Sequence, residues 1–247
     1  SHRQLQSTPL QVRYPQGVRD ALGIMSEQLS LSVSDLTRIL VEDALSEMFL
    51  PADNIVRRLL SRMEHIMQAH DISATTMAAL LAPWNIRPAV FREPDRLTDY
   101  LTGEILAALA DWFYLSPEWL NGRVHYPLYR PGDWPATQEI FCRIISAREN
   151  MDIILWHGFP FAGTHSGEYC GVLLRQKKEI NNTIIYPVLS LYPVRMDIEK
   201  EGWFQMARKI SPDIPVRAVT LTPAQAEYLI TGKILPTALF RVPLSPW

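Results

Sequence analysis

The hydrophobic pattern of the chain changes its period within the first 50 residues. Apolar and polar residues alternate over the stretch Leu10-Gln11-Val12-Arg13-Tyr14, and this period of two predicts a half-buried strand. Pro15 lacks a backbone amide and ends the strand. Apolar residues then recur at helical spacing over Gln16–Leu29 and over Ser32–Leu45. One strand and two short helices cannot bury their own apolar faces, so we expect this segment to pair with a second copy.

This strand-helix-helix layout resembles an Arc-repressor-like ribbon-helix-helix domain. In that family, two chains pair their strands into an antiparallel ribbon that lies in the major groove of DNA. The resemblance implies that Gln11 and Arg13 read base edges, and their side chains carry donors that bases accept. It also implies that Ser32, Val33 and Ser34 lie at the helix start that binds a phosphate group.

The charge of the first 50 residues leaves a second interpretation open. They hold four arginines and six acidic residues, which predicts weak non-specific attraction to DNA. Pro9 also stands where the ribbon-helix-helix family has a further outward polar residue. We therefore expect either a homodimer that reads DNA or a unit that only dimerises. The second alternative corresponds to a protein-interaction module of the antitoxin or antirepressor type.

Residues 51–123 show helical periodicity. Apolar and capping residues predict helices over Asn54–His70, Ala74–Leu81 and Pro88–Glu93. The outer face of the first of these helices is expected to be basic because it carries Arg57, Arg58 and Arg62. The segment is therefore expected to form an all-α bundle.

The end of this segment carries a second resemblance. Gly103–Phe113, rich in leucine and alanine with two aromatic residues at its end, leads into the serine-capped turn Ser116–Gly122. This ending is similar to that of lambda-repressor-like helix-turn-helix domains. The resemblance implies a recognition helix that begins near Asn85 and Arg87, with Arg92 on it or just after it. The alternative is a helical spacer that keeps the fold and does not contact DNA.

From residue 124 onward, helical and strand patterns alternate after a connector rich in proline and aromatic residues. The adjacent Asn181 and Asn182 form a turn signal and favour an antiparallel hairpin. The segment therefore predicts an α+β domain with an antiparallel sheet. Its expected elements are a helix over Ala136–Glu149, strands over Asp152–Trp156, Tyr169–Leu174 and Thr183–Leu191, a helix over Ile198–Ile210, a strand over Val216–Leu221, and a helix capped by Thr222.

Few residues in the sequence suggest a catalytic, ligand-binding or metal site. Four residues between two predicted strands could line a ligand pocket, although such an aromatic cluster also suits a core: Trp156, His157, Phe159 and Phe161. The spacing of the histidines and cysteines matches no closed zinc pattern, so we expect no metal site. The spacing also supports no catalytic set, and we expect neither an enzyme nor a bound cofactor.

The composition places limits on these interpretations. The 247 residues suggest one large or two to three small domains, and the formal net charge of −2 gives no overall attraction to nucleic acid or membrane. Two cysteines, Cys142 and Cys170, fit a reducing compartment. No apolar run is long enough to span a membrane, and the first residues lack a signal-peptide core. We therefore expect a cytoplasmic protein without a membrane partner.

Taken together, the patterns predict a multi-domain protein. Residues 1–50 form a ribbon-helix-helix (β-α-α) unit, residues 51–123 a helix-turn-helix-like bundle, and residues 124–247 the α+β domain. The expected function is that of a bacterial or phage transcriptional regulator, such as a repressor. It binds double-stranded DNA at a pseudo-palindromic operator as a homodimer. The last domain is expected to bind a small-molecule or protein effector.

Overall fold

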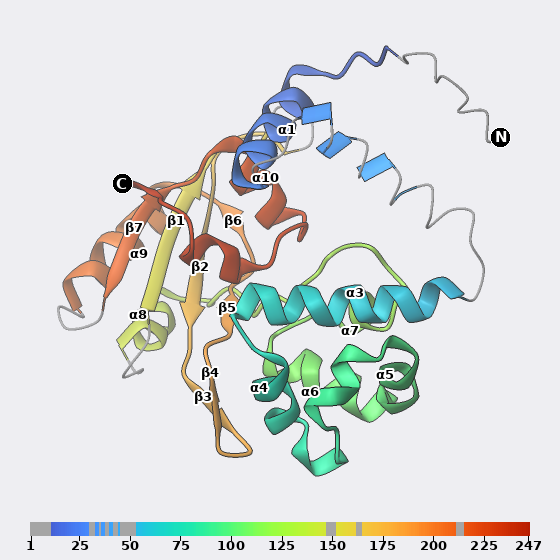
Figure 1. Ribbon diagram of the computed structural model, residues 1–247. Coiled ribbons are helices and arrows are strands. Elements are labelled where there is room, and N and C mark those ends of the chain that lie inside the picture. Colours follow the sequence, from blue (N-terminus) through green and yellow to red (C-terminus); the bar gives the residue numbers. More distant parts are fainter. Residues whose placement is uncertain are drawn as a thin grey trace. The chain divides into compact units, whose positions relative to one another are not determined.

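The computed structural model describes residues 11–29, 33–34, 36–37, 40–41, 44, 53–146, 152–161, 165–210 and 215–247. The chain divides into two compact units, Ser1–Phe49 and Leu50–Trp247. Figure 1 shows the elements of both units. The predicted boundary between residues 123 and 124 falls inside the second unit. No helix among the described residues is long and apolar enough to cross a membrane.

The first unit contains the helix that the pattern predicts. Helix α1 spans Gln16–Leu29, and the carbonyl of Pro15 accepts hydrogen bonds from the amides of Val18 and Arg19 in its first turn. Residues 11–15 lie in neither a helix nor a strand. The expected ribbon forms between two chains, so the conformation of one chain does not test it. Much of the second predicted helix, including Ser32, lies outside the described residues.

The first part of the second unit is helical, as predicted. Three of its α-helices begin at capping residues: the hydroxyls of Ser73, Thr102 and Ser116 accept hydrogen bonds from backbone amides in the first turn of α4, α6 and α7. The bounds are α3 Asp53–His70, α4 Ala74–Leu80, α5 Pro94–Tyr100, α6 Gly103–Trp112 and α7 Pro117–Leu120, with two 3₁₀ helices, η1 Ala82–Trp84 and η2 Pro88–Arg92.

The remainder forms a sheet with helices, and its strand order is β5-β2-β1-β7-β8, with β6 also paired to β2. The strands are β1 Asp152–Gly158, β2 Tyr169–Arg175, β5 Val188–Ser190, β6 Val194–Arg195, β7 Val216–Thr220 and β8 Ser245–Pro246. A separate hairpin joins β3 Lys178–Ile180 to β4 Thr183–Ile185. The helices are α8 Gln138–Ser146, α9 Ile198–Ile210, α10 Pro223–Ile230 and the 3₁₀ helix η3 Pro236–Phe240.

The sheet corrects two of the predictions. It is mixed rather than antiparallel, because β7 pairs parallel to β1 after a connection that includes α9. The strand expected over Thr183–Leu191 is divided into β4 and β5 around Pro187, since proline cannot donate a ladder hydrogen bond. The turn at Asn181 and Asn182 is confirmed: both residues have positive φ, 49° and 60°, and they join β3 to β4.

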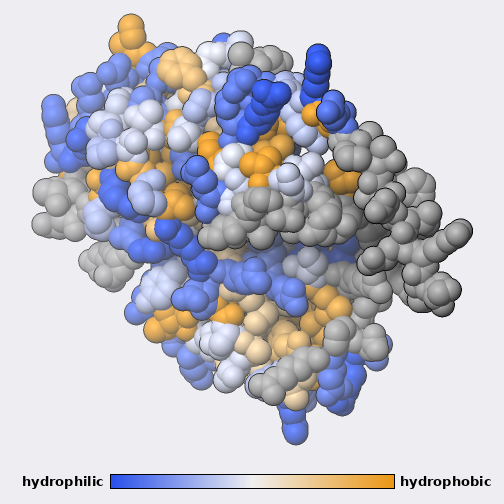
Figure 2. All heavy atoms as spheres, turned by 45° about the horizontal axis from the view of Figure 1, so that its top comes forward, coloured by the Kyte–Doolittle hydropathy of each residue, from blue (hydrophilic) through white to orange (hydrophobic). Residues whose placement is uncertain are grey.

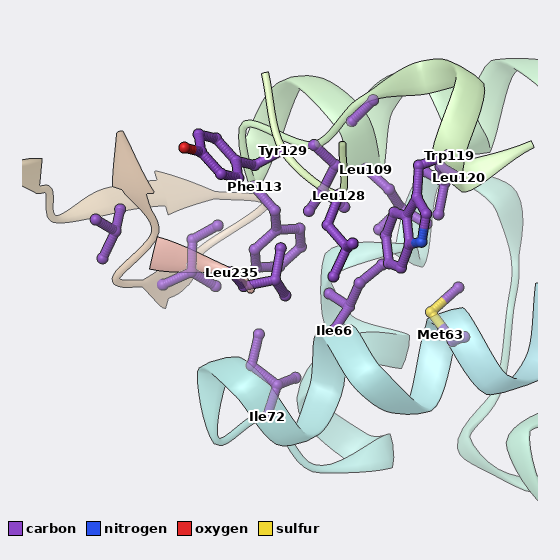
Figure 3. Close-up of a cluster of buried hydrophobic side chains, with 14 of the residues drawn as sticks. Met63, Ile66, Ile72, Leu109, Phe113, Trp119, Leu120, Leu128, Tyr129 and Leu235 are labelled. Carbon is purple, nitrogen blue, oxygen red and sulfur yellow. The ribbon is translucent and has the colours of Figure 1, made fainter. Parts of the chain in front are cut away.

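Both faces of the sheet are buried under helices. This explains why the helical segment and the sheet segment form one compact unit. On one face, Ile154 and Trp156 join a cluster that reaches the helices α3, α4, α6 and α7. On the other face, Ile153 and Leu155 join a cluster with residues of α8 and α9. Figure 1 shows these two groups of helices on opposite sides of the sheet, and Figure 3 shows Ile66, Phe113, Leu128 and Leu235 meeting in the first cluster.

Arg62 does not belong to an exposed basic face, and that expectation is wrong for this residue. Its side chain is buried, and its guanidinium donates hydrogen bonds to the carbonyls of Trp119 and Val124. The same guanidinium lies 5.4 Å from the centroid of the Trp119 ring, a cation–π distance. A buried charge must be paired or hydrogen-bonded, and these contacts tie α3 to α7 and to the segment after it.

We predict that Gly171→Ala destabilises the second unit. A Cβ atom at this position would lie 2.6 Å from the indole of Trp156, whose side chain is fully buried. Overpacking of this kind costs about 1–3 kcal/mol, measurable as a lower free energy of unfolding in denaturant. The matched control is Gly103→Ala, where an added Cβ meets nothing within 4 Å. Equal stability of the two variants would contradict the close packing of Trp156 on Gly171.

Candidate functional site

The candidate DNA-reading residues of the first unit are accessible. Gln11 and Arg13 are both exposed, and Val12 between them is 53% exposed. Val33 and Ser34 are helical and exposed, whereas Ser32 lies outside the described residues. Exposed apolar side chains accompany these polar ones in the first unit: Val12, Val18, Val33, Leu40 and Val41. Figure 2 shows such apolar side chains among polar ones on one face of the molecule.

The expected recognition helix near Asn85 and Arg87 is not a single helix. Asn85 has a left-handed conformation with φ of 56°, and Arg87 is extended ahead of the five-residue η2. Pro88 and Pro94 each begin a new short helix, because proline suits the first helical position and disfavours the α conformation in the residue before it. Asn85 and Arg87 are exposed and help to line a hollow of about 300 Å³, and the side chain of Arg92 lies outside the description.

The structure separates two of the four residues that were expected to line a ligand site, because Trp156 and His157 lie on opposite faces of the sheet. Trp156 is fully buried in the core on one face of the sheet. His157 follows it in β1, and consecutive strand residues point to opposite faces. Phe159 is 58% exposed and Phe161 is half-buried beyond the end of the strand. The structure therefore separates Trp156 from His157 and leaves His157 with other neighbours.

His157 is the centre of a polar cluster at the end of β1. Its Nδ1 atom lies in hydrogen-bond contact with the Glu168 carboxylate, and its Nε2 atom is 2.8 Å from Oγ1 of Thr220. The β1–β7 register sets His157 beside Thr220, and Glu168 precedes the first residue of β2. The ring of Trp247 packs on the imidazole at a centroid distance of 4.3 Å. Sequence reasoning named His157 but missed these partners, which only the strand register brings together.

The tautomer of His157 follows from these contacts. An ionised carboxylate only accepts hydrogen bonds, so the N–H group at Nδ1 donates a hydrogen bond to Glu168. In the neutral imidazole Nε2 is then an acceptor, and the hydroxyl of Thr220 donates to it. A hydroxyl, an imidazole and a carboxylate in this order can activate the hydroxyl as a nucleophile. The same bonds also satisfy three polar side chains between three paired strands, which is a structural role.

No group of three or more potential metal ligands occurs among the described residues. His165 Nδ1 is 3.4 Å from the carboxylate of the buried Glu227. Burial raises the pKa of the Cys170 thiol to about 12 and also raises that of Cys142. Both thiols are therefore protonated near neutral pH, as expected for structural cysteines.

A second hollow, of about 330 Å³, lies where the end of α3 meets η3 and β2. It contains two guanidiniums, two aromatic rings and the Asp71 carboxylate. Arg175 already pairs with Asp152, and Arg241 already donates to the Gln68 carbonyl, but both keep further N–H donors that can bind a small anionic ligand. Its lining residues are Ala69, His70, Asp71, Arg175, Tyr186, Thr237, Phe240 and Arg241. No local pattern indicates this hollow, because the end of α3 lies more than 100 positions before the other lining residues.

His70, at the edge of this hollow, makes the stability of the second unit depend on pH. Burial, with help from the charge of Arg241, lowers its pKa from 6.5 to about 4. The unfolded chain therefore binds the proton more readily, and stability falls as pH decreases from about 6.5 to about 4. A shift of this size corresponds to a loss on the order of 2–3 kcal/mol. His70→Gln should flatten this decrease in denaturant unfolding measured across the range, and an unchanged slope would contradict the assignment.

Comparisons with known proteins add no family to this geometry. The chain matches no family model, no curated protein and no solved structure. The function is consequently inferred from residues of the two units. In the first unit these are the exposed polar and apolar side chains, and in the second unit they are the His157 cluster and the anion-compatible hollow.

Proposed function

We propose that the chain is a homodimeric transcriptional regulator whose first unit, Ser1–Phe49, reads a DNA operator. The observation that carries this proposal is the sequence of exposed side chains just before α1. Gln11 and Arg13 are exposed and polar, and Val12 between them is exposed and apolar. In a ribbon made with a second copy, Val12 would face the protein and the two polar side chains would face the DNA.

The apolar residues of the first unit support pairing with a second copy. Exposed apolar side chains gain about 25 cal/mol for each Å² that they bury, so a unit that leaves several exposed is stabilised by a partner. Those left exposed include Val18 in α1 and Leu40 and Val41 in the segment after it. A two-fold dimer presents each reading residue twice, and its operator is expected to be a pseudo-palindrome.

The second unit is proposed to bind an effector. The hollow beside Arg175 and Arg241 has a volume in the range of small-ligand sites, and its guanidiniums favour an anionic compound. The region near Asn85 and Arg87 is less suited to DNA, because its two short helices offer no long recognition helix. We therefore assign DNA reading to the first unit alone.

A specific observation favours the alternative function of a dimeric protein-interaction module. DNA binding by a first unit with six acidic residues would gain from positive charge elsewhere. Arg62, one source of that charge, is buried and hydrogen-bonded to backbone carbonyls. If the remaining arginines do not compensate, the first unit dimerises without DNA and the protein acts through a protein partner.

We predict that Arg13→Ala weakens operator binding by about 1–3 kcal/mol per half-site and relaxes the preference at one guanine. The reason is the loss of a bidentate contact between the guanidinium and the base. Binding titrations against the selected operator and against single-base variants measure both effects. Arg19→Ala, at an exposed position in α1, is the matched control and should leave the base preference unchanged. Wild-type affinity and preference in Arg13→Ala would contradict DNA reading by the ribbon.

We also predict that Val12→Pro weakens the dimer. Proline at this position removes a ladder hydrogen bond from the proposed ribbon. The dimer dissociation constant from sedimentation equilibrium should rise by about tenfold or more, equivalent to the net worth of one to two hydrogen bonds. Val12→Thr keeps the backbone amide and the β-branched shape, and serves as the control. A dissociation constant that is the same in both variants would show that the interface lies elsewhere.

A further inference from the structure

Helix α9, Ile198–Ile210, has two apolar faces rather than one. Its first face is buried against the sheet and contains Trp203, Phe204 and Ala207. The second face is exposed and contains Ile198, Met206 and Ile210, at 89%, 43% and 44% exposure. These three residues and Gly202 follow each other at intervals of four, so they form one continuous stripe along the helix. We call this exposed set the α9 stripe.

Gly202 occupies the middle of the α9 stripe. A Cβ atom added at this position would meet nothing within 4 Å, so packing within the chain does not require a glycine there. Glycine is among the poorest residues for a helix interior, and an exposed alanine would stabilise α9 more. A glycine on an exposed apolar stripe allows the backbone of another helix to approach closely. This observation points to a helix as the partner of the stripe.

The charges of α9 identify the orientation of that partner. The first turn carries Glu199 and Glu201 with Lys200 between them, which pairs with Asp197 and lies 3.6 Å from the Glu199 carboxylate, and the last turn carries Arg208 and Lys209. A helix with the same charges fits beside α9 in the antiparallel direction, because acidic and basic ends then meet. Among the described helices, α8 has a similar charge pattern but only one exposed large apolar residue, Ile140, whereas α9 has both the charge pattern and the stripe. The partner that fits is therefore α9 of a second copy.

We propose that α9 pairs antiparallel with α9 of a second copy about a two-fold axis that passes near the middle of the helix. In this arrangement Ile198 lies opposite the other copy's Ile210. The side chain of Met206 enters the space over the other copy's Gly202. Glu199 lies opposite Lys209, and each of these contacts occurs twice. The interface is isologous, as expected for a symmetric dimer.

The pairing goes beyond DNA reading, but its strength rests on the proposed dimer of the first unit. The 13 residues of α9 span only about 20 Å. Two such helices bury less surface than an independent stable interface needs. Two chains already joined through their first units would hold their α9 helices at a high effective concentration. The α9 pair then joins the second units of the same dimer, or it links two dimers.

Disulfide trapping in the full chain tests the pairing. The variant Ile198→Cys/Ile210→Cys is made in a Cys142→Ala background, because Cys142 is partly exposed, whereas Cys170 is fully buried. The two new positions of one chain are about 18 Å apart, too far for a bond within the chain. Under mild copper–phenanthroline oxidation by air, the pairing predicts a covalent dimer on a non-reducing gel, reversed by dithiothreitol.

The matched control is Glu201→Cys/Arg208→Cys in the same background. Both positions are exposed on α9, but they lie on its other flank, away from the stripe. The stripe variant should cross-link about tenfold faster than this control. Equal rates would mean collisional cross-linking and would overturn the proposal. So would an absence of cross-linking in the stripe variant.

Exchanging the charges of Glu199 and Lys209 gives a second test of the pairing. A defect in folding would not produce the expected loss and recovery of cross-linking. In the trapping background, Glu199→Lys should slow cross-linking because lysine would then face lysine. The double exchange Glu199→Lys/Lys209→Glu should restore it. Both substitutions oppose the dipole of α9, so a purely local effect on the helix would make the double variant worse than the single one. A slower double variant would overturn the proposed pairing.

Sedimentation of the unmodified chain separates the failure of this inference from the failure of the proposed function. A dimer that binds DNA but shows no selective cross-linking contradicts only the α9 pairing. A monomer without selective cross-linking contradicts both proposals. Selective cross-linking in a chain that binds no DNA supports the α9 pairing and favours the protein-interaction alternative for the first unit.

Discussion

The second unit depends on the burial of strand β1 on both of its faces. Ile153 and Leu155 pack under α8 and α9, and Ile154 and Trp156 pack against the helical side. Because four consecutive residues are fully buried, neither layer can be removed without exposing half of the strand. The predicted helical and α+β segments consequently share one core. Gly171 contributes by leaving space on the neighbouring strand for the indole of Trp156.

The polar groups of this unit occur where the apolar layers end. His157 follows the last fully buried residue of β1's central run, and Glu168 and Thr220 satisfy both of its ring nitrogens. Arg62 in α3 donates hydrogen bonds to the carbonyl of Trp119 in α7 and to that of Val124 after this helix. In both cases, a residue type associated with function meets the hydrogen-bonding needs of a closely packed structure. This is why the functional proposal relies on the first unit, where Gln11 and Arg13 remain exposed.

Local signals predicted the elements well. The bounds of α1 and α9 agree with the apolar periodicity, and Thr222 caps α10 through a capping box with Gln225. Long-range features could not be read in the same way. The parallel pairing of β1 with β7 joins residues more than 60 positions apart, and no periodicity encodes it. Thr220 reaches His157 through this pairing, and Arg62 is buried by contacts with Trp119 and Val124, 57 and 62 positions away. The sequence therefore suggested the residues but not their surroundings.

The central claim is that the first unit reads DNA as a dimer. The most direct measurement is the selection of bound duplexes from a random-sequence pool by the full-length chain, at a stated salt concentration. The account predicts enrichment of a pseudo-palindrome whose two halves are related by the two-fold axis of the dimer. A pool that remains random after repeated rounds, with a correctly folded chain, would contradict DNA reading and leave the protein-interaction module as the function of this unit.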